Sequence, residues 1–404
     1  MTSLPTRKTK ASMNHLNAAN NSFHQELFRR VQLARDLMEK MSLDALLLFT
    51  GPNLFYFTGM PCGRSGSRPF IYLLPRKGEP VLIVHDGRQF ETHNFTAIQD
   101  IRTYTRLSHL PLDQLIAAIQ DNNLLNKRIG VELGGEMVLD LPMLEYQSLT
   151  SALAQAEFVD ASPLLWKMRM IKSPYEVAQI ARACEITSCA YERTFKVARA
   201  GMSEAEIESL MYYQLLKSGG SAPWVLITSG AGNYDLVSKG SSSRVLETGD
   251  LVWMDVGCAV NGYWSDFSRA GVIGHPSQMQ AEAQRGIYEI TRIGVNMVRD
   301  GVAVSEIGQR CNEAIVALDL PVTSNISGLA ARVGHGLGLV VTELPSLNES
   351  DTTILEPGMV ITIEPGVATK YGTFHIEQNL VVTRNGSHVL SIANWELSSI
   401  KASR

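Results

Sequence analysis

Two aspartates in the second half of the sequence stand where apolar residues are expected. Asp255 follows the apolar run Leu251–Met254, and Asp266 lies eleven residues further on. Between them comes Asn261-Gly262, a strong signal for a two-residue turn between antiparallel strands. Such a hairpin would bring the two carboxylates close together. Like charges at short range repel each other, and a shared divalent cation would remove that cost.

The same anomaly recurs near the C-terminus. Glu364 ends the β-rich run Val360–Ile363, and Glu377 lies within another strand pattern. His335 lies between two glycines, whose small size lets backbone and metal approach closely. Each of these residues alone is more typical of a turn, a loop or a packed strand. Together, four carboxylates and one imidazole can hold two ions about 3.5–4 Å apart, with a position left for water.

The elements of the second half must make these side chains converge. Ser173-Pro174-Tyr175-Glu176 is a capping box with proline at the first helical position, and it predicts a helix to about Ala198. Further predicted helices begin near Ser203, cover Ser277–Val298, and run from about Val304 to Leu318. Predicted strands are Val225–Thr228, Leu251–Val256, Val360–Glu364 and Ile376–Val382. Helices in pairs among strands predict an α+β arrangement.

The first half alternates strands with helices, which predicts an α/β domain. An amphipathic helix is expected from Phe23 to about Met41. Predicted strands are Ala45–Phe49, Phe70–Leu74, Val81–Val84, Arg128–Val131 and Phe158–Asp160, and predicted helices are Leu112–Gln120 and about Met143–Ala154. The chain is therefore divided into a flexible polar extension at 1–24, an N-terminal domain at 25–165 and a catalytic domain at 166–404.

Composition excludes several classes of protein. The 404 residues are 45% hydrophobic and 19% charged, with a net charge of −4, which argues against a nucleic-acid partner. No apolar run approaches the length of a membrane span, and no apolar segment follows the basic N-terminus, so we expect a cytoplasmic protein without a membrane anchor. The five cysteines include no CxxC pair, which argues against a disulfide framework or a structural zinc site.

The order of these motifs resembles the pita-bread metallohydrolases, which include prolidase, aminopeptidase P, methionine aminopeptidase and creatinase. The matching segments are Gly249–Val252, Ser265–Arg269, Gly334–Gly338, Leu355–Met359 and Lys172–Pro174. In the first half, Asp44–Phe49 and Asn53–Gly59 are similar to the creatinase/prolidase N-terminal domain. The resemblance covers about residues 25 to 395. It implies a C-terminal pita-bread domain preceded by an α/β creatinase-like domain.

This resemblance also implies roles for single residues. Asp255 would chelate one ion and Asp266 would bridge both, while His335 and Glu364 would bind the other ion and Glu377 would bridge. Two divalent ions are implied, with Mn²⁺ preferred and Co²⁺, Zn²⁺ or Fe²⁺ as alternatives. Glu364 would carry the proton of the attacking water beside His335. Family members with two domains are commonly homodimers, so we expect a homodimer here.

The sequence departs from the proline-specific peptidases at two positions that hold histidine in that group. Seven positions after His335 stands Thr342, and 17 positions before Asp255 stands Ser238. A hydroxyl donates a hydrogen bond but carries no positive charge at neutral pH. His375 replaces the arginine usual in prolidases two residues before the last ligand, and is a candidate substrate contact or supporting group.

Two further residues are candidates for supporting or substrate-binding roles. Arg269 is expected to pair with a carboxylate of the site. Tyr234 is a candidate pocket residue, although a packed core position is the more common role of such an aromatic.

The hypotheses are ranked by these features. The first is a hydrolase of a peptide bond in a short peptide, an Xaa-Pro dipeptidase or aminopeptidase-like enzyme. The second is a hydrolase of a small amide or amidine, as in ectoine hydrolase-like and creatinase-like relatives, which the missing histidines favour. A lyase ranks lower because Asp255-Val256-Gly257 keeps the hydrolase pattern, and a metal-free binding module is disfavoured by the complete ligand set.

Overall fold

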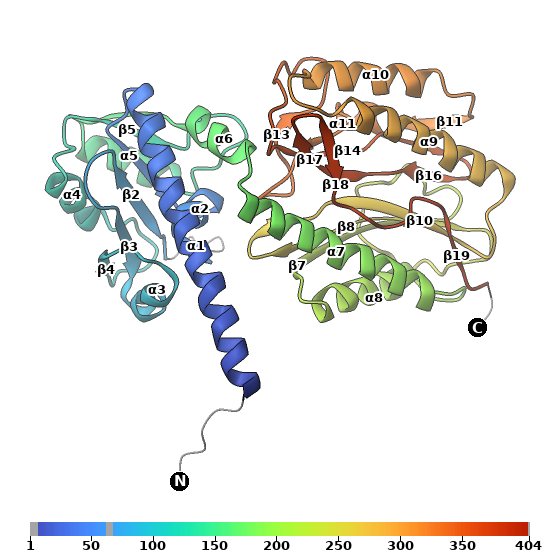
Figure 1. Cartoon of the computed structure of the whole chain (residues 1–404), viewed down its shortest axis with the longest axis horizontal. Helices are drawn as coiled ribbons and strands as arrows, with labels where there is room; N and C mark the ends of the chain where they lie inside the picture. Colours follow the sequence, from blue (N-terminus) through green and yellow to red (C-terminus); the bar gives the residue numbers. More distant parts are fainter. Residues whose placement is uncertain (1–6, 62–67, 403–404) are drawn as a thin grey trace, which may run out of the picture. The chain divides into compact units, whose positions relative to one another are not determined.

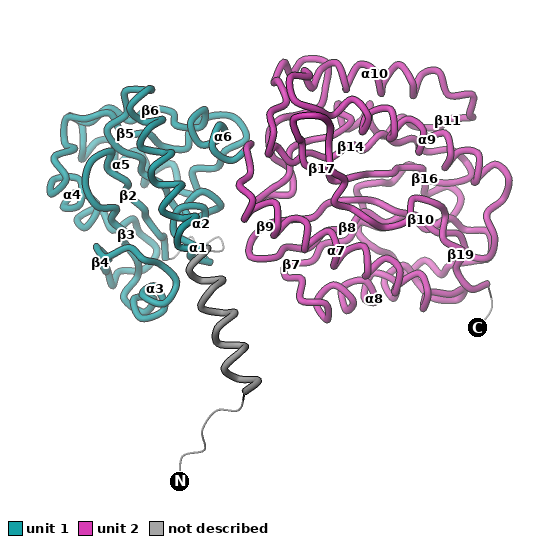
Figure 2. The backbone as a smooth tube through the Cα atoms, viewed as in Figure 1, with its two compact units in different colours: residues 1–169 teal, residues 170–404 magenta. Residues whose placement is uncertain are grey.

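The structure is a computed structural model that describes residues 7–61 and 68–402, with side chains described from residue 23 onward. Two compact units divide the chain, Met1–Arg169 and Met170–Arg404 (Figure 2). A flexible extension was predicted over residues 1–24. Only its last two residues lie in the part of the chain whose side chains are described. The helix expected from Phe23 belongs to α1, which begins at Arg7.

The first unit is built on one six-stranded sheet of order β4-β3-β2-β1-β5-β6 (Figure 1). Neighbours β1/β2 and β2/β3 are antiparallel, and the remaining pairs are parallel. Its strands are β1 (Ala45–Phe49), β2 (Ile71–Pro75), β3 (Val81–His85), β4 (Asp100–Tyr104), β5 (Arg128–Val131) and β6 (Glu157–Asp160). Its helices are α1 (Arg7–Lys40), α2 (Pro52–Thr58), η1 (Asp86–Arg88), α3 (Gln89–Phe95), α4 (Leu112–Asp121), α5 (Met143–Ala152) and α6 (Ser162–Met170).

Both faces of this sheet are covered. In β1 every residue is buried, because alternate side chains point to opposite faces and each face meets a layer of helix or loop. Leu47 packs in a cluster with Leu115 of α4 and Leu149 of α5. The predicted strands of this unit are found within one or two residues of their expected ends. Strand β4 was not predicted, because its residues Asp100–Tyr104 are mostly polar and only partly buried.

A buried acid holds part of this unit together. Glu132, directly after β5, is 4% exposed, and its carboxylate accepts a hydrogen bond of 2.6 Å from Asn53. The amide oxygen of Asn53 in turn accepts from Arg169 at 3.1 Å. Burial raises the pKa of Glu132 to about 7, against the opposing effects of the Asn53 bond and the Arg169 charge.

This raised pKa predicts a pH-dependent stability. Below about pH 4.5 the folded and unfolded states both hold the proton, whereas between pH 4.5 and 7 only the folded state holds it. Ionisation therefore stabilises only the unfolded state as pH rises through this range. The free energy of unfolding falls by about 3 kcal/mol and stays constant above pH 7. Glu132→Gln keeps an acceptor for Asn53 and should remove this loss. We expect the free energy of unfolding of this variant to equal that of the wild type near pH 4.5 and to exceed it at pH 8.

Hydrogen exchange of the β5 amides in the full chain measures the effect. Glu79→Gln, at an exposed position of the same unit, is the matched control and should follow the wild type at both pH values. A difference between Glu132→Gln and the wild type that stays constant from pH 4.5 to 8 would contradict the prediction.

The second unit places helices on two sides of its strands, with α7 and α8 along one side and α9 and α10 along the other (Figure 1). These helices are α7 (Pro174–Val197), α8 (Glu204–Lys217), α9 (Gln278–Met297) and α10 (Val304–Val316), with the short α11 (Ile326–Ala330). Complete capping boxes begin α7 at Ser173, α8 at Ser203 and α9 at Ser277. Each box satisfies backbone N–H groups that a helix start leaves unpaired, which is why these boundaries were readable in the sequence.

Three sheets form the centre of this unit. One has the order β19-β10-β8-β7 with β9 paired to β8, the second is β11-β15-β16, and the third is β13-β12-β14-β17-β18. The strands are β7 (Ser221–Ser229), β8 (Leu251–Val260), β9 (Tyr263–Trp264), β10 (Phe267–Ile273), β11 (Val322–Asn325), β12 (His335–Gly336), β13 (Glu343–Ser346), β14 (Val360–Ile363), β15 (Gly366–Thr369), β16 (Gly372–His375), β17 (Gln378–Thr383), β18 (Gly386–Val389) and β19 (Ser398–Ile400). The arrangement confirms the predicted α+β class.

Two further expectations concern membranes and thiols. Among the described helices, none has both the length and the apolarity that crossing a membrane requires. Cys184, Cys258 and Cys311 are free, buried thiols and Cys189 is free and partly buried, while Cys62 lies outside the described residues.

Candidate metal centre

The first hairpin carries both aspartates on one face. Asn261 and Gly262 adopt positive φ values of 48° and 84°, as a two-residue hairpin turn requires. Val260 pairs with Tyr263 across the turn, and in the same register Asp255 pairs with Ser268 of β10. Asp266 lies two residues before Ser268, just outside β10. Since side chains two apart share a face of a strand, Asp255 and Asp266 are diagonal neighbours.

A second hairpin carries the two glutamates. Strands β14 and β17 pair Ile363 with Gln378, and β15 and β16 pair Gly366 with His375 in the same register. The two pairs thus form one long hairpin that is interrupted where Glu364 and Glu377 lie opposite each other. Like charges at directly opposed positions destabilise a sheet. The interruption therefore places the two carboxylates directly against each other.

His335, in β12, completes the cluster. Its Nδ1 lies 2.9 Å from the carbonyl oxygen of Gly336, which can only accept, so Nδ1 carries the proton and Nε2 has a free lone pair. Nε2 points at the carboxylates, 3.3 Å from Oδ2 of Asp266 and 3.5 Å from Oε1 of Glu364. A Cβ added at Gly334 would lie 2.2 Å from the carbonyl oxygen of Thr362, which explains the small residue before the histidine.

Several oxygen atoms of these carboxylates have no hydrogen-bond partner in the part of the chain that the structure describes. Among the described residues, Oδ1 of Asp255, Oδ1 of Asp266, Oε1 of Glu364 and both carboxylate oxygens of Glu377 are buried without a hydrogen-bond partner. Buried carboxylate oxygens are almost always hydrogen-bonded or bound to a metal. Oxygen ligands with an imidazole are the donor set of divalent transition metals. The residues present therefore fit a metal-binding centre.

The electrostatics agree with this conclusion. Burial raises the pKa of Asp266 to about 7 and that of Glu364 to about 7. Burial, and then the charges of the neighbouring acids, raise the pKa of Asp255 and of Glu377 well above their ordinary values. Burial lowers the pKa of His335. The protein alone thus disfavours ionised carboxylates here, and bound cations would restore them.

Two groups of three residues can each hold one ion. Asp255, His375 and Glu377 form one group, and Asp266, His335 and Glu377 form the other, with the ligand atoms in each group within 4.8 Å of one another. Glu377 belongs to both groups. The structure therefore brings together all five residues predicted from the sequence, and adds His375 to them.

Two residues tie the hairpins to each other through the backbone. Asn379, fully buried, accepts a hydrogen bond from the N–H of Asp266 at 3.1 Å and donates one to the carbonyl oxygen of Asp266. Arg269 donates to the carbonyl oxygens of Ser268 and Glu377, both at 2.7 Å. The expectation that Arg269 pairs with a carboxylate of the site was wrong, because its guanidinium binds carbonyl groups and so positions the Glu377 backbone.

The other predicted residues lie in different settings. Ser238 is exposed, in the segment between β7 and β8. Tyr234 packs in the core of the second unit, and its hydroxyl accepts a hydrogen bond of 3.2 Å from the N–H of Leu251, so its role in the structure is packing rather than lining a pocket. Thr342 is partly buried, and its hydroxyl accepts a hydrogen bond of 3.4 Å from Arg332.

Arg332 was missed by the sequence analysis. Its side chain is 27% exposed, and its Nε lies 3.9 Å from Oε1 of Glu364. The only signal in the sequence was its position three residues before His335. An isolated arginine in a loop is usually a solvated surface residue, so this position does not by itself predict a role in the site.

A buried ion pair was also missed. Nζ of Lys172 lies 3.1 Å from Oε2 of Glu343, with the two side chains 2% and 1% exposed. Oε1 of Glu343 accepts from the N–H groups of Leu339 and Val340, at 2.8 and 3.2 Å. This carboxylate thereby shapes the loop that follows His335.

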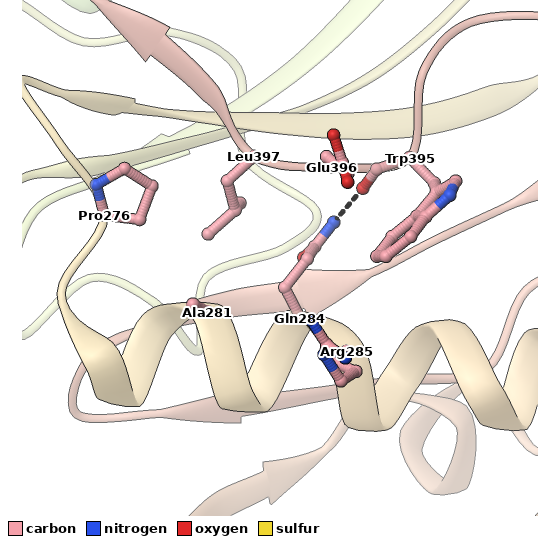
Figure 3. Close-up of a pocket in the computed structure, with 7 residues that line it drawn as sticks. All are labelled: Pro276, Ala281, Gln284, Arg285, Trp395, Glu396 and Leu397. Atoms are coloured by element: carbon pink, nitrogen blue, oxygen red, sulfur yellow. Dashed lines mark hydrogen bonds between the residues drawn. The ribbon is translucent and has the colours of Figure 1, made fainter.

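A separate cavity of about 230 Å³ lies between α9 and the C-terminal segment (Figure 3). Gln284 reaches across it and donates a hydrogen bond of 2.5 Å to the carbonyl oxygen of Trp395. Residues of the carboxylate cluster do not line it. The cavity is therefore distinct from the candidate metal centre.

The fold and the cluster together define a class, an α+β protein with a carboxylate-rich centre built to hold divalent cations. The model of metallopeptidase family M24 matches residues 178–384, and that of the creatinase/prolidase N-terminal domain matches residues 30–171. The chain therefore belongs to metallopeptidase family M24, as the motifs predicted, and is a metal-dependent hydrolase.

Individual relatives agree with this assignment. An Xaa-Pro dipeptidase of Pyrococcus horikoshii is 28% identical over 370 residues, which span 91% of this chain and 98% of the relative. The solved structure of the prolidase from Pyrococcus horikoshii superposes with a TM-score of 0.77 at 26% identity, covering 91% of this chain and 99% of the other. An Xaa-Pro dipeptidase structure from Bacillus anthracis shares the fold, with a TM-score of 0.80 at 24% identity over 93% of this chain and 100% of the other.

Proposed function

We propose that the protein is an Xaa-Pro dipeptidase or aminopeptidase-like enzyme that hydrolyses the bond before proline in a short peptide. It would work in the cytoplasm, as a homodimer and with two Mn²⁺ ions. One observation carries this proposal: four carboxylates from two separate hairpins meet His335, and several of their buried oxygen atoms have no hydrogen-bond partner among the described residues. The similarity to an Xaa-Pro dipeptidase and to a prolidase supports a peptide as substrate.

In this proposal Asp255 would hold one ion, His335 and Glu364 would hold the other, and Asp266 and Glu377 would be shared by both. When bound, two such ions acidify a water molecule and stabilise negative charge on a carbonyl oxygen. Glu364 would take up and return the proton that the attacking water gives up, because a carboxylate beside that water can act as a general base and then as a general acid. The lone pair of His335 Nε2, 3.5 Å from Oε1 of Glu364, is placed to hold the same ion as that carboxylate.

A second candidate function is hydrolysis of a small amide or amidine other than a peptide. The hydroxyl residues at positions 238 and 342 favour it, since they cannot supply the charge of the peptidase histidines. A panel of Xaa-Pro dipeptides beside cyclic amidines and N-acyl amino acids separates the two functions. Cleavage of a non-peptide amide with no cleavage of any peptide would refute the peptidase proposal.

Arg332 is a candidate source of the positive charge that the residues at positions 238 and 342 cannot supply. Its guanidinium faces Glu364 and donates to Thr342, while its buried Nε has no hydrogen-bond partner among the described residues. A guanidinium is charged at every physiological pH and pairs well with a carboxylate. We infer that it binds the C-terminal carboxylate of a dipeptide.

Substituting Arg332→Met should raise KM for an Xaa-Pro dipeptide by about 10- to 100-fold, which corresponds to the loss of one charge-assisted hydrogen bond. KM for the same dipeptide with an amidated C-terminus should change little, because that substrate offers no carboxylate. Steady-state kinetics on both substrates measure the difference. Arg310→Met, which removes an exposed arginine from α10, serves as control. Equal changes for the two substrates would show that Arg332 does not bind the carboxylate.

A further inference from the structure

His375 is placed among the acids of the centre by the geometry of its strand. It is the last residue of β16, two residues before Glu377, so both side chains lie on one face. Its partner across the strands is Gly366. A Cβ at Gly366 would lie 2.6 Å from Cδ2 of His375, so only glycine leaves room for the ring there. The ring of Trp253 flanks it, with centroids 5.7 Å apart.

The hydrogen bonds of His375 define which ring nitrogen is free. Nε2 lies 2.9 Å from the carbonyl oxygen of Glu364. A carbonyl oxygen only accepts, so Nε2 carries the proton and Nδ1 keeps its lone pair. Nδ1 is buried and has no hydrogen-bond partner among the described residues, and the residue is only 6% exposed. A buried acceptor left in this state calls for a ligand.

A ligand position is available beside it. A ring nitrogen of His375 lies within 4.8 Å of carboxylate oxygens of Asp255 and Glu377. The other three-residue group has the same composition, one aspartate, one histidine and the shared Glu377. Each half of the cluster therefore offers one imidazole.

We propose that His375 is a sixth metal ligand, which binds through Nδ1 the ion held by Asp255. This inference rests on the proposed dinuclear centre and extends it, because each ion then receives one imidazole. Added nitrogen ligation raises affinity for Zn²⁺ and Co²⁺ relative to Mn²⁺, since imidazole suits the former ions better than an all-oxygen site does. The ion held by Asp255 should accordingly gain more affinity from His375 when it is Zn²⁺ or Co²⁺ than when it is Mn²⁺.

Two substitutions separate ligation from packing. Gln places its amide nitrogen near the position of Nε2, so His375→Gln keeps a donor to the Glu364 carbonyl and loses the Nδ1 ligand. Asn places an amide oxygen near the position of Nδ1, so His375→Asn keeps a ligand atom and loses that donor. His388→Gln, at an exposed position on β18, is the matched control.

The experiment titrates metal-free full-length protein with Co²⁺ and with Mn²⁺ by calorimetry, and counts coupled imidazole nitrogens by pulsed electron paramagnetic resonance of the Mn²⁺-loaded protein. We expect two ions per chain and two imidazoles in the wild type. His375→Gln should lower the affinity for the ion held by Asp255 at least tenfold and remove one coupled imidazole. His375→Asn should lower this affinity less, and His388→Gln should match the wild type. Circular dichroism confirms that each variant is folded.

The outcomes distinguish this inference from the function on which it rests. The role of His375 would be overturned if the wild type binds two ions but shows only one coupled imidazole, and if folded His375→Gln binds both ions with unchanged affinity. That result would leave the dinuclear centre standing. Binding of no divalent ion by the wild type would refute the proposed function itself, and this inference with it.

Discussion

Asp266→Ala should remove at least one of the two bound ions and lower kcat/KM by on the order of 10³-fold or more, because the carboxylate proposed to serve both ions is lost. The fold should survive, since the backbone of Asp266 is held by Asn379 and not by its own side chain. In the absence of metal the variant should be at least as stable as the wild type, because the neighbouring acids lose a repelling charge. Metal analysis, kinetics and thermal unfolding with and without Mn²⁺ measure these effects.

Asp319→Ala removes an exposed carboxylate from the same unit and should retain full metal content and activity. The decisive comparison is the gain in unfolding temperature on adding metal. The wild type and the control should both gain stability, because an ion that binds only the folded state stabilises it. Retained turnover in Asp266→Ala, or an equal metal-induced gain, would show that the centre lies elsewhere.

The second large effect concerns the buried ion pair. Lys172→Met should destabilise the protein by about 3–5 kcal/mol, because it removes the ammonium group that faces the buried carboxylate of Glu343. Activity should fall as well, since the same carboxylate holds the N–H groups of Leu339 and Val340 in the loop after His335. Denaturant unfolding of the metal-free protein gives the free energy, and kinetics give the second effect.

Lys196→Met, at an exposed position of α7, is the control and should change stability by less than about 0.5 kcal/mol. The double variant Lys172→Met with Glu343→Gln should recover most of the loss, because the amide keeps an oxygen acceptor for the loop and no charge is left unpaired. A double variant as unstable as Lys172→Met alone would mean that packing, and not the unpaired charge, causes the destabilisation.

Much of the fold was readable from local signals. Capping boxes at Ser173, Ser203 and Ser277 are formed by residues three apart, so the sequence alone carries all of their chemistry. The turn at Asn261-Gly262 is equally local, because both residues tolerate positive φ. Strand β4 was missed because pairing with β3, and not an apolar pattern, makes it a strand.

The five acidic and imidazole residues of the centre were found for a different reason. A charged residue in or at the end of an apolar strand conflicts with its surroundings, and the conflict is visible without coordinates. Arg332, Asn379 and the pair Lys172–Glu343 left no such sign. An arginine, an asparagine, a lysine or a glutamate is ordinary anywhere on a surface, and only contacts across long separations give these residues a role.

The sequence by itself determined where the helices begin, where the hairpin turns and which side chains repel their neighbours, because each depends on residues a few positions apart. Only the tertiary structure decided that Arg269 binds carbonyl groups rather than a carboxylate, and that Nδ1 of His375 is buried without a hydrogen-bond partner among the described residues. Those facts depend on which nitrogen faces which oxygen when two hairpins more than a hundred residues apart are packed together, and no local pattern encodes that orientation.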